Sequence, residues 1–497
     1  MNKISMEQIV SLCKRRGFIY QHDELYGGLG SVWDYGPYGS LMKENIKWEF
    51  IRRFVLGRDD VVMLDSAILT KPETLRASGH IDNFTDPLVE CKVCHKRFRQ
   101  DQIGEIKSEI RNPKSETNSN IQIQNESFLC EGDKEHNFTD PKNFNLMFST
   151  KLGSTEDSYE VAYLRPETAQ GMFTNFANVL DSTRRKLPFG IAQIGKSFRN
   201  EITTGNFNFR SREFELAEIE YFVKEGKDDE LFSFWISEWE RFIYSLGIKE
   251  GALHRIDHKK EKLAHYSKAT TDLEYDFPFG RSELAGIANR TDFDLKAHKK
   301  ASGKSLEYFD SESNKKYIPY VIEPTLGIDR LFLALLCDAI EIFPMGRITS
   351  QIQNANLKNP MPTGRQENDN SKFKIEADGE GNQVEIVLHL NPKIAPIQVA
   401  VLPLSKKPEL TEPAKKIAQD IRKEFANWRM VEYDETGSIG KRYRRQDEIG
   451  TPLCITYDFE SNNDQKVTVR NRDTMEQDRI KIADLSNYLK SELENWN

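Results

Sequence analysis

The sequence has few cysteines and lacks long apolar segments. It contains six cysteines in 497 residues, and only Cys91 and Cys94 are close together, so a disulfide-stabilised scaffold is excluded. The longest apolar run, Leu331–Cys337, is far shorter than the roughly 20 residues of a transmembrane helix. Residues 1–17 lack the apolar core of a signal peptide and end in a basic cluster. We therefore expect no secretory signal and a cytoplasmic location.

Glycine and proline are not enriched, and the acidic and basic residues nearly balance. Glycine and proline number 29 and 19, which excludes collagen-like or linker-like sequence. Hydrophobic residues make up 38% and aromatic residues 10%, which is enough apolar mass to exclude global disorder. The 70 basic and 78 acidic residues leave a net charge of -8. This balance indicates no overall basic surface for nucleic acid, although a local basic face would suffice for binding.

The length and the changes of composition along the chain predict several domains. We divide the chain into a first unit at 1–350, a polar linker at 351–393 and a separate unit at 394–497. Residues 85–145 look like an insertion in the first unit. Strand-like and helix-like segments alternate in 394–497, which indicates an α/β domain. The basic cluster at 441–445 is either the solvated start of a helix or a nucleic-acid contact.

The strongest chemical pattern is a predicted β-hairpin with strands at 191–201 and 211–222. Alternation along the second strand places Phe214, Glu218 and Glu220 on one face. At the strand rise of about 3.3 Å per residue, Phe214 and Glu218 are about 13 Å apart, a length that matches a nucleotide joined to a small ammonium compound. A solvated edge face would explain any one of these residues. An aromatic ring together with two carboxylates favours a cleft for a charged ligand.

Three motifs resemble those of the class II aminoacyl-tRNA synthetases. Arg199–Glu201 followed by Arg210–Phe214 is similar to motif 2. Glu323–Arg330, which runs from a predicted strand into an amphipathic helix, is similar to motif 3, and Gly36–Gly39 before a helix that ends near Phe54 is similar to motif 1. The resemblance implies an α+β fold, with an antiparallel sheet flanked by helices.

Two further segments narrow the resemblance. Leu164–Gly171 and Glu283–Asp292 are similar to signatures of the glycyl-tRNA synthetases of the homodimeric (α2) type, and the resemblance extends from about Ile9 to Tyr488. It implies ATP-dependent activation of glycine to glycyl-adenylate, followed by transfer to the 3′-terminal adenosine of tRNA(Gly). The implied substrates and partners are glycine, ATP with Mg²⁺, tRNA(Gly) and a second copy of the chain. Residues 394–497 resemble the family's anticodon-binding domain.

Two other functions stay open at this point. The same fold recurs as a non-catalytic accessory subunit of a DNA polymerase, which is a binding module. Such a paralogue should lose its phosphate-binding arginines, whereas Arg199, Arg210 and Arg330 are all present. A class II-like ligase with a different acceptor is the second alternative, and the intact C-terminal domain argues against it.

The resemblance assigns the groups that hold the phosphates. Both reactants are anions, so the site must supply cations. Arg199 would hold the α-phosphate and the substrate carboxylate, and Arg210 and Arg330 would hold the γ-phosphate. An isolated arginine more often forms an ordinary salt bridge, but three in motif context favour the phosphate role. The expected catalytic residues are Arg199, Arg330 and the metal-side carboxylate Glu283.

The resemblance also assigns the adenine contacts. Phe214 would stack on the adenine ring, with Arg330 as a cation–π partner on the other side. Glu201 would accept a hydrogen bond from the adenine amino group. The expected ATP-binding residues are Arg199, Asn200, Glu201, Phe209, Arg210, Ser211, Arg212, Glu213, Phe214, Glu283, Leu284, Gly327, Ile328, Asp329 and Arg330.

Glycine offers an ammonium group and a carboxylate but no side chain, so its pocket must be small and anionic. Glu167, Glu218 and Glu323 are expected around the ammonium group; the alternative for each is a hydrogen-bonded strand carboxylate. Steric fit excludes the methyl group of alanine better than a loose apolar pocket does. Thr325 stands where the family usually has serine, and Leu216–Ala217 stands where it often has Gln-Met. The expected glycine-binding residues are Arg76, Glu167, Phe214, Glu215, Leu216, Ala217, Glu218, Glu323, Pro324, Thr325, Leu326 and Gly327.

A zinc site is an open question at the sequence level. Cys91 and Cys94 form half of a typical site, and Cys130 with His136 could complete it. Structural zinc sites usually have four nitrogen or sulfur ligands at regular spacing. Many relatives carry a second cysteine pair, which is broken here after Cys130. The alternative is a set of free thiols in an insertion.

Overall fold

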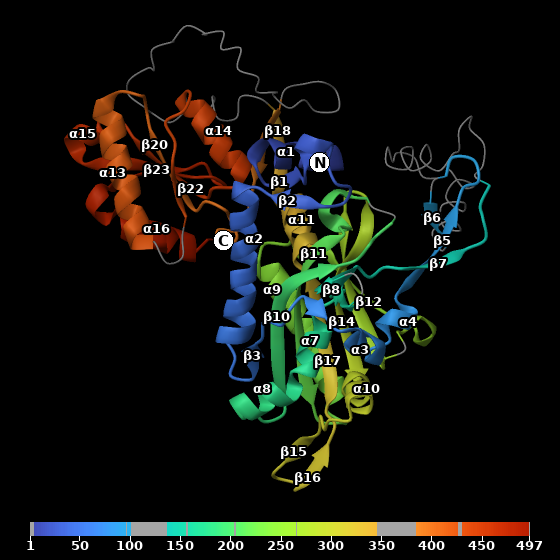
Figure 1. The fold of residues 1–497 in the computed structure, drawn as a ribbon. Coiled ribbons are helices and arrows are strands. Elements are labelled where there is room, and N and C mark those ends of the chain that lie inside the picture. The colour runs from blue at the N-terminus through green and yellow to red at the C-terminus, as the bar shows by residue number, and fades with distance from the viewer. Residues whose placement is uncertain are drawn as a thin grey trace.

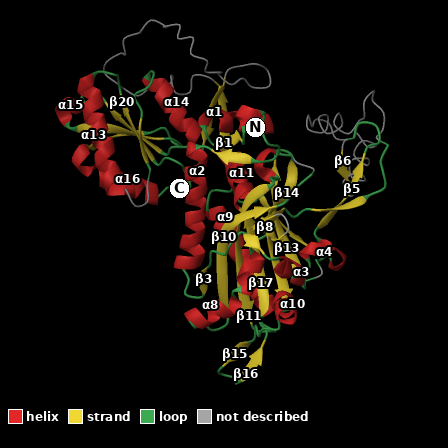
Figure 2. Cartoon of the chain, viewed as in Figure 1, coloured by secondary structure: helices red, strands yellow, loops and turns green. Residues whose placement is uncertain are grey.

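The computed structural model describes residues 4–95, 97–100, 137–155, 158–202, 205–264, 266–344, 384–425 and 430–496. The first unit is a large sheet flanked by helices, and the C-terminal unit, orange and red in Figure 1, lies beside the N-terminal helices α1 (Met6–Arg16) and α2 (Pro37–Ile51). Figure 2 shows that both units mix helices and strands. Among the described helices, none combines the length and apolar character needed to cross a membrane.

The first unit is built on a seven-stranded sheet in the order β12-β13-β14-β17-β11-β10-β3. Every neighbouring pair is antiparallel except β10 with β3, which is parallel. The predicted α+β class with an antiparallel sheet is therefore confirmed. The bounds are β3 Val61–Met63, β10 Phe189–Phe198, β11 Glu213–Val223, β12 Leu253–Asp257, β13 Ala269–Phe277, β14 Gly280–Thr291 and β17 Tyr320–Gly327.

The predicted hairpin is β10 with β11, and its strand ends differ from the expected ones by a few residues. In the centre of the sheet, Glu218 of β11 pairs with Gln193 of β10 and with Thr325 of β17. Ile219, on the alternate face of β11, is buried in the main hydrophobic core. Phe214 and Glu218 line a pocket on the opposite face. The predicted alternation is confirmed: one face of β11 packs into the core and the other face lines the pocket.

The two helices expected from motifs 1 and 3 are both present. Helix α2 continues as a π-helical turn over Arg52–Leu56, and its proline stands in the first turn, where a fixed φ favours helix initiation. Gly39 of α2 lies against Phe18, so close that a Cβ would stand 1.8 Å from its carbonyl oxygen. No larger residue fits there. Helix α11 (Ile328–Ala339) begins directly after β17.

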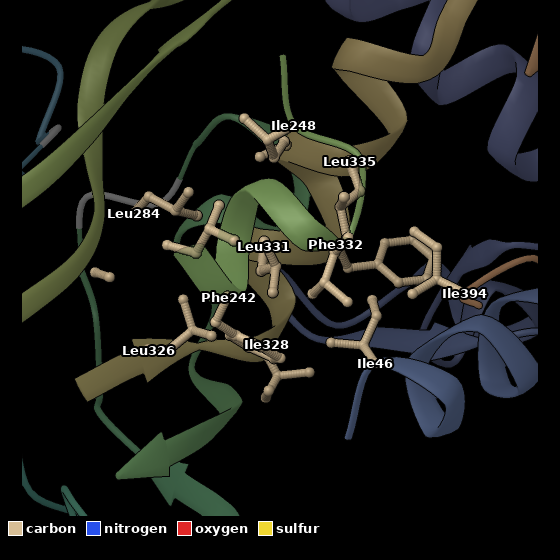
Figure 3. Packing of buried hydrophobic residues seen from close by; sticks show 14 of the residues in the cluster. Ile46, Phe242, Ile248, Leu284, Leu326, Ile328, Leu331, Phe332, Leu335 and Ile394 are labelled. Atoms are coloured by element: carbon tan, nitrogen blue, oxygen red, sulfur yellow. The ribbon is translucent and has the colours of Figure 1, made fainter. Parts of the chain in front are cut away.

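The main core forms around α11. Leu331, Phe332 and Leu335 of this helix are buried, and Figure 3 shows them near Ile46 of α2 and near Ile394. Each buried aliphatic or aromatic side chain contributes about 1.5–3 kcal/mol relative to an exposed one. This packing therefore fixes the first turn of α11, which carries Asp329 and Arg330, against the sheet.

Smaller elements surround the large sheet. The three-stranded sheet β4-β9-β8 contacts helix α3. A second three-stranded sheet, β6-β5-β7, contains both ends of the predicted insertion at 85–145. Residues 101–136 of this insertion lie outside the described residues. The bounds are β1 Ile19–Gln21, β2 Trp33–Tyr35, β4 Leu69–Thr70, α3 Pro72–Ala77, α4 His80–Asn83, β5 Thr85–Glu90, β6 Arg97–Arg99, β7 Lys142–Asn145, β8 Ser149–Thr155, β9 Ser158–Leu164, α7 Ala169–Thr174, α8 Phe176–Thr183, α9 Asp228–Ser245, α10 Phe293–Ser302, β15 Tyr308–Asp310, β16 Lys315–Tyr317, β18 Ile340–Pro344 and β19 Val384–Leu388, with 3₁₀ turns at Glu24–Tyr26, Phe207–Phe209 and Lys260–Lys262.

The C-terminal unit is an α/β domain with its own core, as predicted. Its sheet has the order β21-β20-β22-β23-β24, parallel over the first three strands and antiparallel over the last two pairs. The sequence pattern missed the edge strand β24. The bounds are β20 Val399–Pro403, α13 Pro408–Phe425, β21 Val431–Tyr433, α14 Ile439–Ile449, β22 Leu453–Tyr457, α15 Ser461–Asp464, β23 Lys466–Asn471, β24 Gln477–Lys481, a 3₁₀ turn Ile482–Asp484 and α16 Leu485–Glu494.

The junction between the units differs from the expected one. Strand β19, inside the predicted linker 351–393, pairs antiparallel with β18. Ile394 and Ile397 belong to the main core of the first unit. Ile449 of α14 belongs to the same core, so this core extends across the predicted boundary at 394. Residues 351–383 of the predicted linker lie outside the described residues.

The basic cluster at 441–445 lies on α14 at the contact between the units, and neither interpretation from the sequence describes it fully. Arg442 is buried and donates to the carbonyl oxygens of Glu435 (2.7 Å) and Gly437 (2.8 Å). Arg444 binds the carboxylate of Glu385 of β19 at 3.1 Å. Arg442 thus braces its own domain and Arg444 joins that domain to β19, and the cluster's charge alone reveals neither contact.

Candidate active site

A pocket opens where β11, β14, β17 and the first turn of α11 meet. Motif 2 supplies one wall through β11 and the loop before it, and motif 3 supplies the other through β17 and α11. Strands far apart in the sequence thus bring both motifs together. The lining residues are Arg199, Glu201, Asn208, Phe209, Arg210, Ser211, Phe214, Glu215, Leu216, Glu218, Glu283, Leu284, Ala285, Thr325, Gly327, Asp329 and Arg330.

One end of the pocket is cationic and aromatic. The guanidinium group of Arg199 lies 5.2 Å from the ring centre of Phe214 and donates to the carbonyl oxygen of Pro166 at 3.1 Å. Arg330 lies 4.5 Å from the ring centre of Phe209. The expected stacking of adenine between Phe214 and Arg330 stays a prediction, because these two contacts involve the side chains alone. Two planar cations thus stand beside two aromatic rings, an arrangement suited to a nucleotide.

Acidic side chains accompany these arginines. Glu283 of β14 forms an ion pair with Arg330 at 3.0 Å, and about half of its side chain is exposed. Burial would raise the pKa of Glu283, but Arg330 outweighs it and holds the pKa below its usual value. Glu201 is 8% exposed and lies 3.8 Å from Arg210. Its Oε2 atom has no hydrogen-bond donor in the described part of the chain, so it is ready to accept one from a ligand.

The other end of the pocket is anionic, and Glu218 marks it. Glu218 is 3% exposed and accepts hydrogen bonds from the backbone N–H of Thr168 at 2.9 Å and from its hydroxyl group. The hydroxyl group of Thr325 donates to the second oxygen at 3.4 Å, so the threonine keeps the hydroxyl of the family's usual serine. Burial and the neighbouring Glu167 raise the pKa of Glu218, while the donors of Thr168 lower it.

Glu167 lies beside Glu218 at the start of α7. His80 lies 3.2 Å from one of its carboxylate oxygens, and Gln170 donates to the other at 2.9 Å. Burial would raise the pKa of Glu167, but His80 and Arg290 outweigh it and hold the pKa far below its usual value. Glu167 is therefore an ionised carboxylate at neutral pH.

Glu323 of β17 completes a group of three carboxylates with Glu167 and Glu218. It is 7% exposed, and Arg290 of β14 donates to it at 2.8 Å. The same guanidinium group donates to Asp294 of α10 at 2.7 and 2.9 Å. Burial together with the two neighbouring glutamates raises the pKa of Glu323 to about 8 despite Arg290. The three carboxylates interact, so their protons belong to the group as a whole.

Several predicted glycine-site residues lie elsewhere. Ala217 and Leu326 are fully buried in the main core on the other face of the sheet, because side chains alternate along a strand; Pro324, also buried, shares this face by position. Glu215 shares that face by strand position and pairs with Lys43 of α2 at 3.2 Å, yet it also contributes to the pocket lining. Arg76 is exposed on α3, 3.9 Å from Glu73, and the structure does not bring it to the pocket.

Some predicted ATP-binding residues brace the walls of the pocket. Asp329 accepts from Lys43 at 2.6 Å and from the backbone N–H of Glu215 at 2.7 Å, so its carboxylate joins motif 3 to the motif 1 helix. Arg212 donates to the carbonyl oxygens of Glu201 (3.2 Å) and Gly30 (2.8 Å). The residues outside the lining are Asn200, Arg212, Glu213 and the fully buried Ile328.

The structure does not test the complete zinc site. Cys91 is buried at the end of β5 and Cys94 lies in the turn that follows. Cys130 and His136 lie outside the described residues. Among the residues that the structure describes, no group of three or more potential ligands is close enough to hold a metal ion. Zinc therefore has no support from this structure.

Sequence reasoning missed four residues that shape the anionic end: His80, Thr168, Arg290 and Asp294. Thr168 and Arg290 lie inside the two quoted signatures, so their position was a usable signal. His80 and Asp294 gave none, because their contacts with Glu167 and Arg290 depend on how α4 and α10 pack.

Two segments of the chain match known domain families. Residues 148–339 match the family model of the tRNA synthetase class II core domain (G, H, P, S and T), and residues 398–492 match the anticodon binding domain. A prolyl-tRNA synthetase structure from Cryptosporidium parvum, complexed with L-proline and AMP, aligns with a TM-score of 0.58 and 15% identity over 98% of this chain and 77% of that one. That likeness concerns the fold alone.

Full-length relatives identify the family. A glycine–tRNA ligase of Caldanaerobacter subterraneus subsp. tengcongensis is 49% identical over 497 residues, 99% of each chain. Those of Streptomyces coelicolor and Geobacillus kaustophilus are 48% and 47% identical, with 98% and 99% of each chain covered. The chain therefore belongs to the glycine–tRNA ligase family of the class II aminoacyl-tRNA synthetases.

Proposed function

We propose that this chain joins glycine to ATP in the pocket described above, releases pyrophosphate and transfers the glycyl group to the 3′-terminal adenosine of tRNA(Gly). The observation that carries the proposal is the polarity of the pocket. Arg199 and Arg330 stand beside aromatic rings at one end, and Glu218 lines the other end, where Glu167 and Glu323 lie next to it outside the lining. A glycyl-adenylate has the matching polarity, with a phosphate and a base at one end and an ammonium group at the other.

In the first step an oxygen of the glycine carboxylate attacks the α-phosphorus of ATP, and the bond to pyrophosphate breaks. Both reactants are anions, so cationic side chains must bring them together and stabilise the charge of the transition state. We assign Arg199 to the α-phosphate, and Arg210 and Arg330 to the γ-phosphate. Mg²⁺ enters with ATP as part of the substrate, and the hard oxygen atoms of Glu283 suit it.

Phe214 and Glu201 are assigned to the adenine ring. Phe214 lies in the lining beside Arg199, so a ring stacked on it is also close to a cation. The unsatisfied Oε2 of Glu201 suits the amino group of adenine. A buried acceptor without a donor costs about 1–3 kcal/mol, and nucleotide binding would recover it.

The group of Glu167, Glu218 and Glu323 is assigned to the ammonium group of glycine. All three are largely buried, where charge pairing is strong. A bound ammonium group would favour the ionised form of Glu323, whose pKa is raised to about 8 in the unliganded chain. Thr325 and Leu216 also line the pocket, and we assign to them the steric contact with any larger side chain. Exclusion of larger amino acids then follows from steric fit as well as charge.

The second step needs tRNA, which the C-terminal domain is proposed to recognise. The 3′-terminal ribose hydroxyl attacks the carbonyl carbon of glycyl-adenylate, and AMP leaves. Residues 398–492 match an anticodon binding domain. This domain contacts the first unit through Tyr38, which donates to Glu432 at 2.7 Å, and through ion pairs of Arg15 and Arg16 with Glu448.

A symmetric dimer is proposed as the working state, and the cytoplasm as its location. Along α2 and the residues after it, Trp48, Leu56 and Met63 are 51%, 65% and 43% exposed. We infer that these exposed apolar side chains belong to an interface, and a two-fold axis is the commonest symmetry for one. Sedimentation analysis of Trp48→Glu against the unmodified chain tests this proposal; an unchanged mass would contradict it.

Glycine-dependent exchange of pyrophosphate into ATP tests the proposed function. The unmodified chain should catalyse exchange with glycine and far less with alanine or serine. A non-catalytic binding subunit would show no exchange with any amino acid. A ligase with another acceptor would show exchange without charging of tRNA(Gly).

A further inference from the structure

Glu220 is a buried acid next to the glycine pocket that none of the steps above uses. It lies on β11 two residues after Glu218 and is 0% exposed. The register of β11 with β17, in which Glu218 faces Thr325, places Glu220 opposite Glu323. Directly opposed residues on neighbouring strands have Cβ atoms about 4.5–5.5 Å apart. Two acidic side chains thus stand side by side behind the pocket.

The carboxyl group of Glu220 has an unusual environment. Neither of its oxygens has a hydrogen-bond partner in the described part of the chain. By contrast, Glu218 accepts from Thr168, and Glu323 accepts from Arg290. A buried ionised carboxylate without a donor is strongly disfavoured, and such a group keeps its proton instead.

The surrounding charges favour the same state. The charged groups that face Glu220 are Glu323 of β17, Glu218 of β11, Asp294 of α10 and Arg290 of β14. Three of these four are acidic, and Arg290 is already shared between Asp294 and Glu323. Burial and the neighbouring Glu323 raise the pKa of Glu220 well above its usual value, and Arg290 compensates only partly.

We propose that Glu220 is protonated at neutral pH and is a positioning residue for glycine, donating its hydrogen bond to Glu323 when the ammonium group enters the pocket. One oxygen of Glu323 is held by Arg290 at 2.8 Å, so a donor on the other oxygen fixes the carboxylate plane. Glu220 also adds no negative charge behind the carboxylates that bind glycine. The inference rests on the proposed function, because it assigns Glu220 to the same glycine pocket.

Two variants of Glu220 separate the proton from the side chain's volume. Glu220→Gln keeps a neutral donor of the same size, so the KM for glycine should stay within about threefold of the unmodified value. Glu220→Met keeps the volume but removes the donor, and should raise the KM for glycine at least about tenfold, with the KM for ATP unchanged. Glu218→Gln is the matched control for losing a carboxyl group that is assigned to bind glycine, on the same strand face.

Infrared difference spectroscopy at neutral pH supplies a readout without substrate. Subtracting the spectrum of Glu220→Gln from that of the unmodified chain should reveal the carbonyl stretch of a protonated carboxylic acid. The proposal is overturned if this band is missing, if Glu220→Gln raises the glycine KM as much as Glu218→Gln, or if Glu220→Met leaves it unchanged. Failure of the proposed function is distinct, because it would abolish glycine-dependent exchange in the unmodified chain and leave the band in place.

Discussion

Replacing Glu218 by glutamine tests the anionic end of the pocket most sharply. The side chain is 3% exposed and stands next to Glu167 and Glu323. The substitution preserves shape but removes one negative charge from the group that is assigned to the ammonium of glycine. It also places an amide opposite the N–H of Thr168, which donates to Glu218 at 2.9 Å. The amide oxygen can still accept that bond.

The expected size of the effect follows from the burial of Glu218. A hydrogen bond to a charged group contributes about 1.5–3 kcal/mol, and each 1.4 kcal/mol changes an equilibrium constant about tenfold. The KM for glycine should therefore rise about 10- to 150-fold. The KM for ATP should change little, because Arg199, Arg210 and Arg330 stand at the other end. Pyrophosphate exchange at varied glycine and varied ATP measures both constants.

The matched control is Glu238→Gln on α9, whose carboxylate pairs with Arg53 at 3.0 Å and does not belong to the pocket lining. It should leave both constants unchanged. If Glu218 merely braces the sheet, its glutamine variant should lower the melting temperature and damage both substrates equally. An unchanged glycine KM with a lowered melting temperature would refute the reasoning.

Three further predictions concern other parts of the chain. Arg199→Ala and Arg330→Ala should each reduce adenylation at least about 100-fold, the scale for one lost charge-stabilising donor, and near-normal pyrophosphate exchange would contradict the assignment. The pKa of Glu323 is raised from 4.5 to about 8 in the folded chain, so its stabilising contribution is present below pH 4.5 and is lost as the pH rises towards 8. The melting temperature of Glu323→Gln should therefore fall less between these pH values than that of the unmodified chain. An identical dependence of the melting temperature on pH would count against the shift. Deleting residues 398–497 should leave adenylation largely intact and abolish charging of tRNA(Gly). Pyrophosphate exchange and tRNA charging measure the two activities, and a melting curve checks that the variant is folded. Full charging would exclude this domain as the part that recognises tRNA.

Local patterns predicted the parts of the site that depend on strand alternation and motif order. Phe214 and Glu218 were placed on one face by period alone, and the structure has both in the pocket lining. The same rule, applied to every residue of motif 3, would have excluded Leu326 from the pocket, since it alternates with Thr325. That error arose from carrying over whole segments instead of one face of each strand.

The remaining features depend on packing between distant segments. Arg290 meets Glu323 because β14 and β17 are neighbours in the sheet, and sequence spacing does not specify strand order. Arg442 looked like a surface charge in a basic run, yet it is 1% exposed and donates to backbone carbonyl oxygens of its own domain. Charge composition does not reveal burial when the partners are main-chain atoms.

The central claim is that one pocket holds the nucleotide at its arginine end and the ammonium group at its carboxylate end. A crystal structure with a non-hydrolysable glycyl-adenylate analogue tests this most directly. The account predicts the adenine ring stacked on Phe214, the phosphate analogue beside Arg199, and the ammonium group within hydrogen-bond distance of Glu218. An ammonium group bound away from Glu167, Glu218 and Glu323 would contradict it.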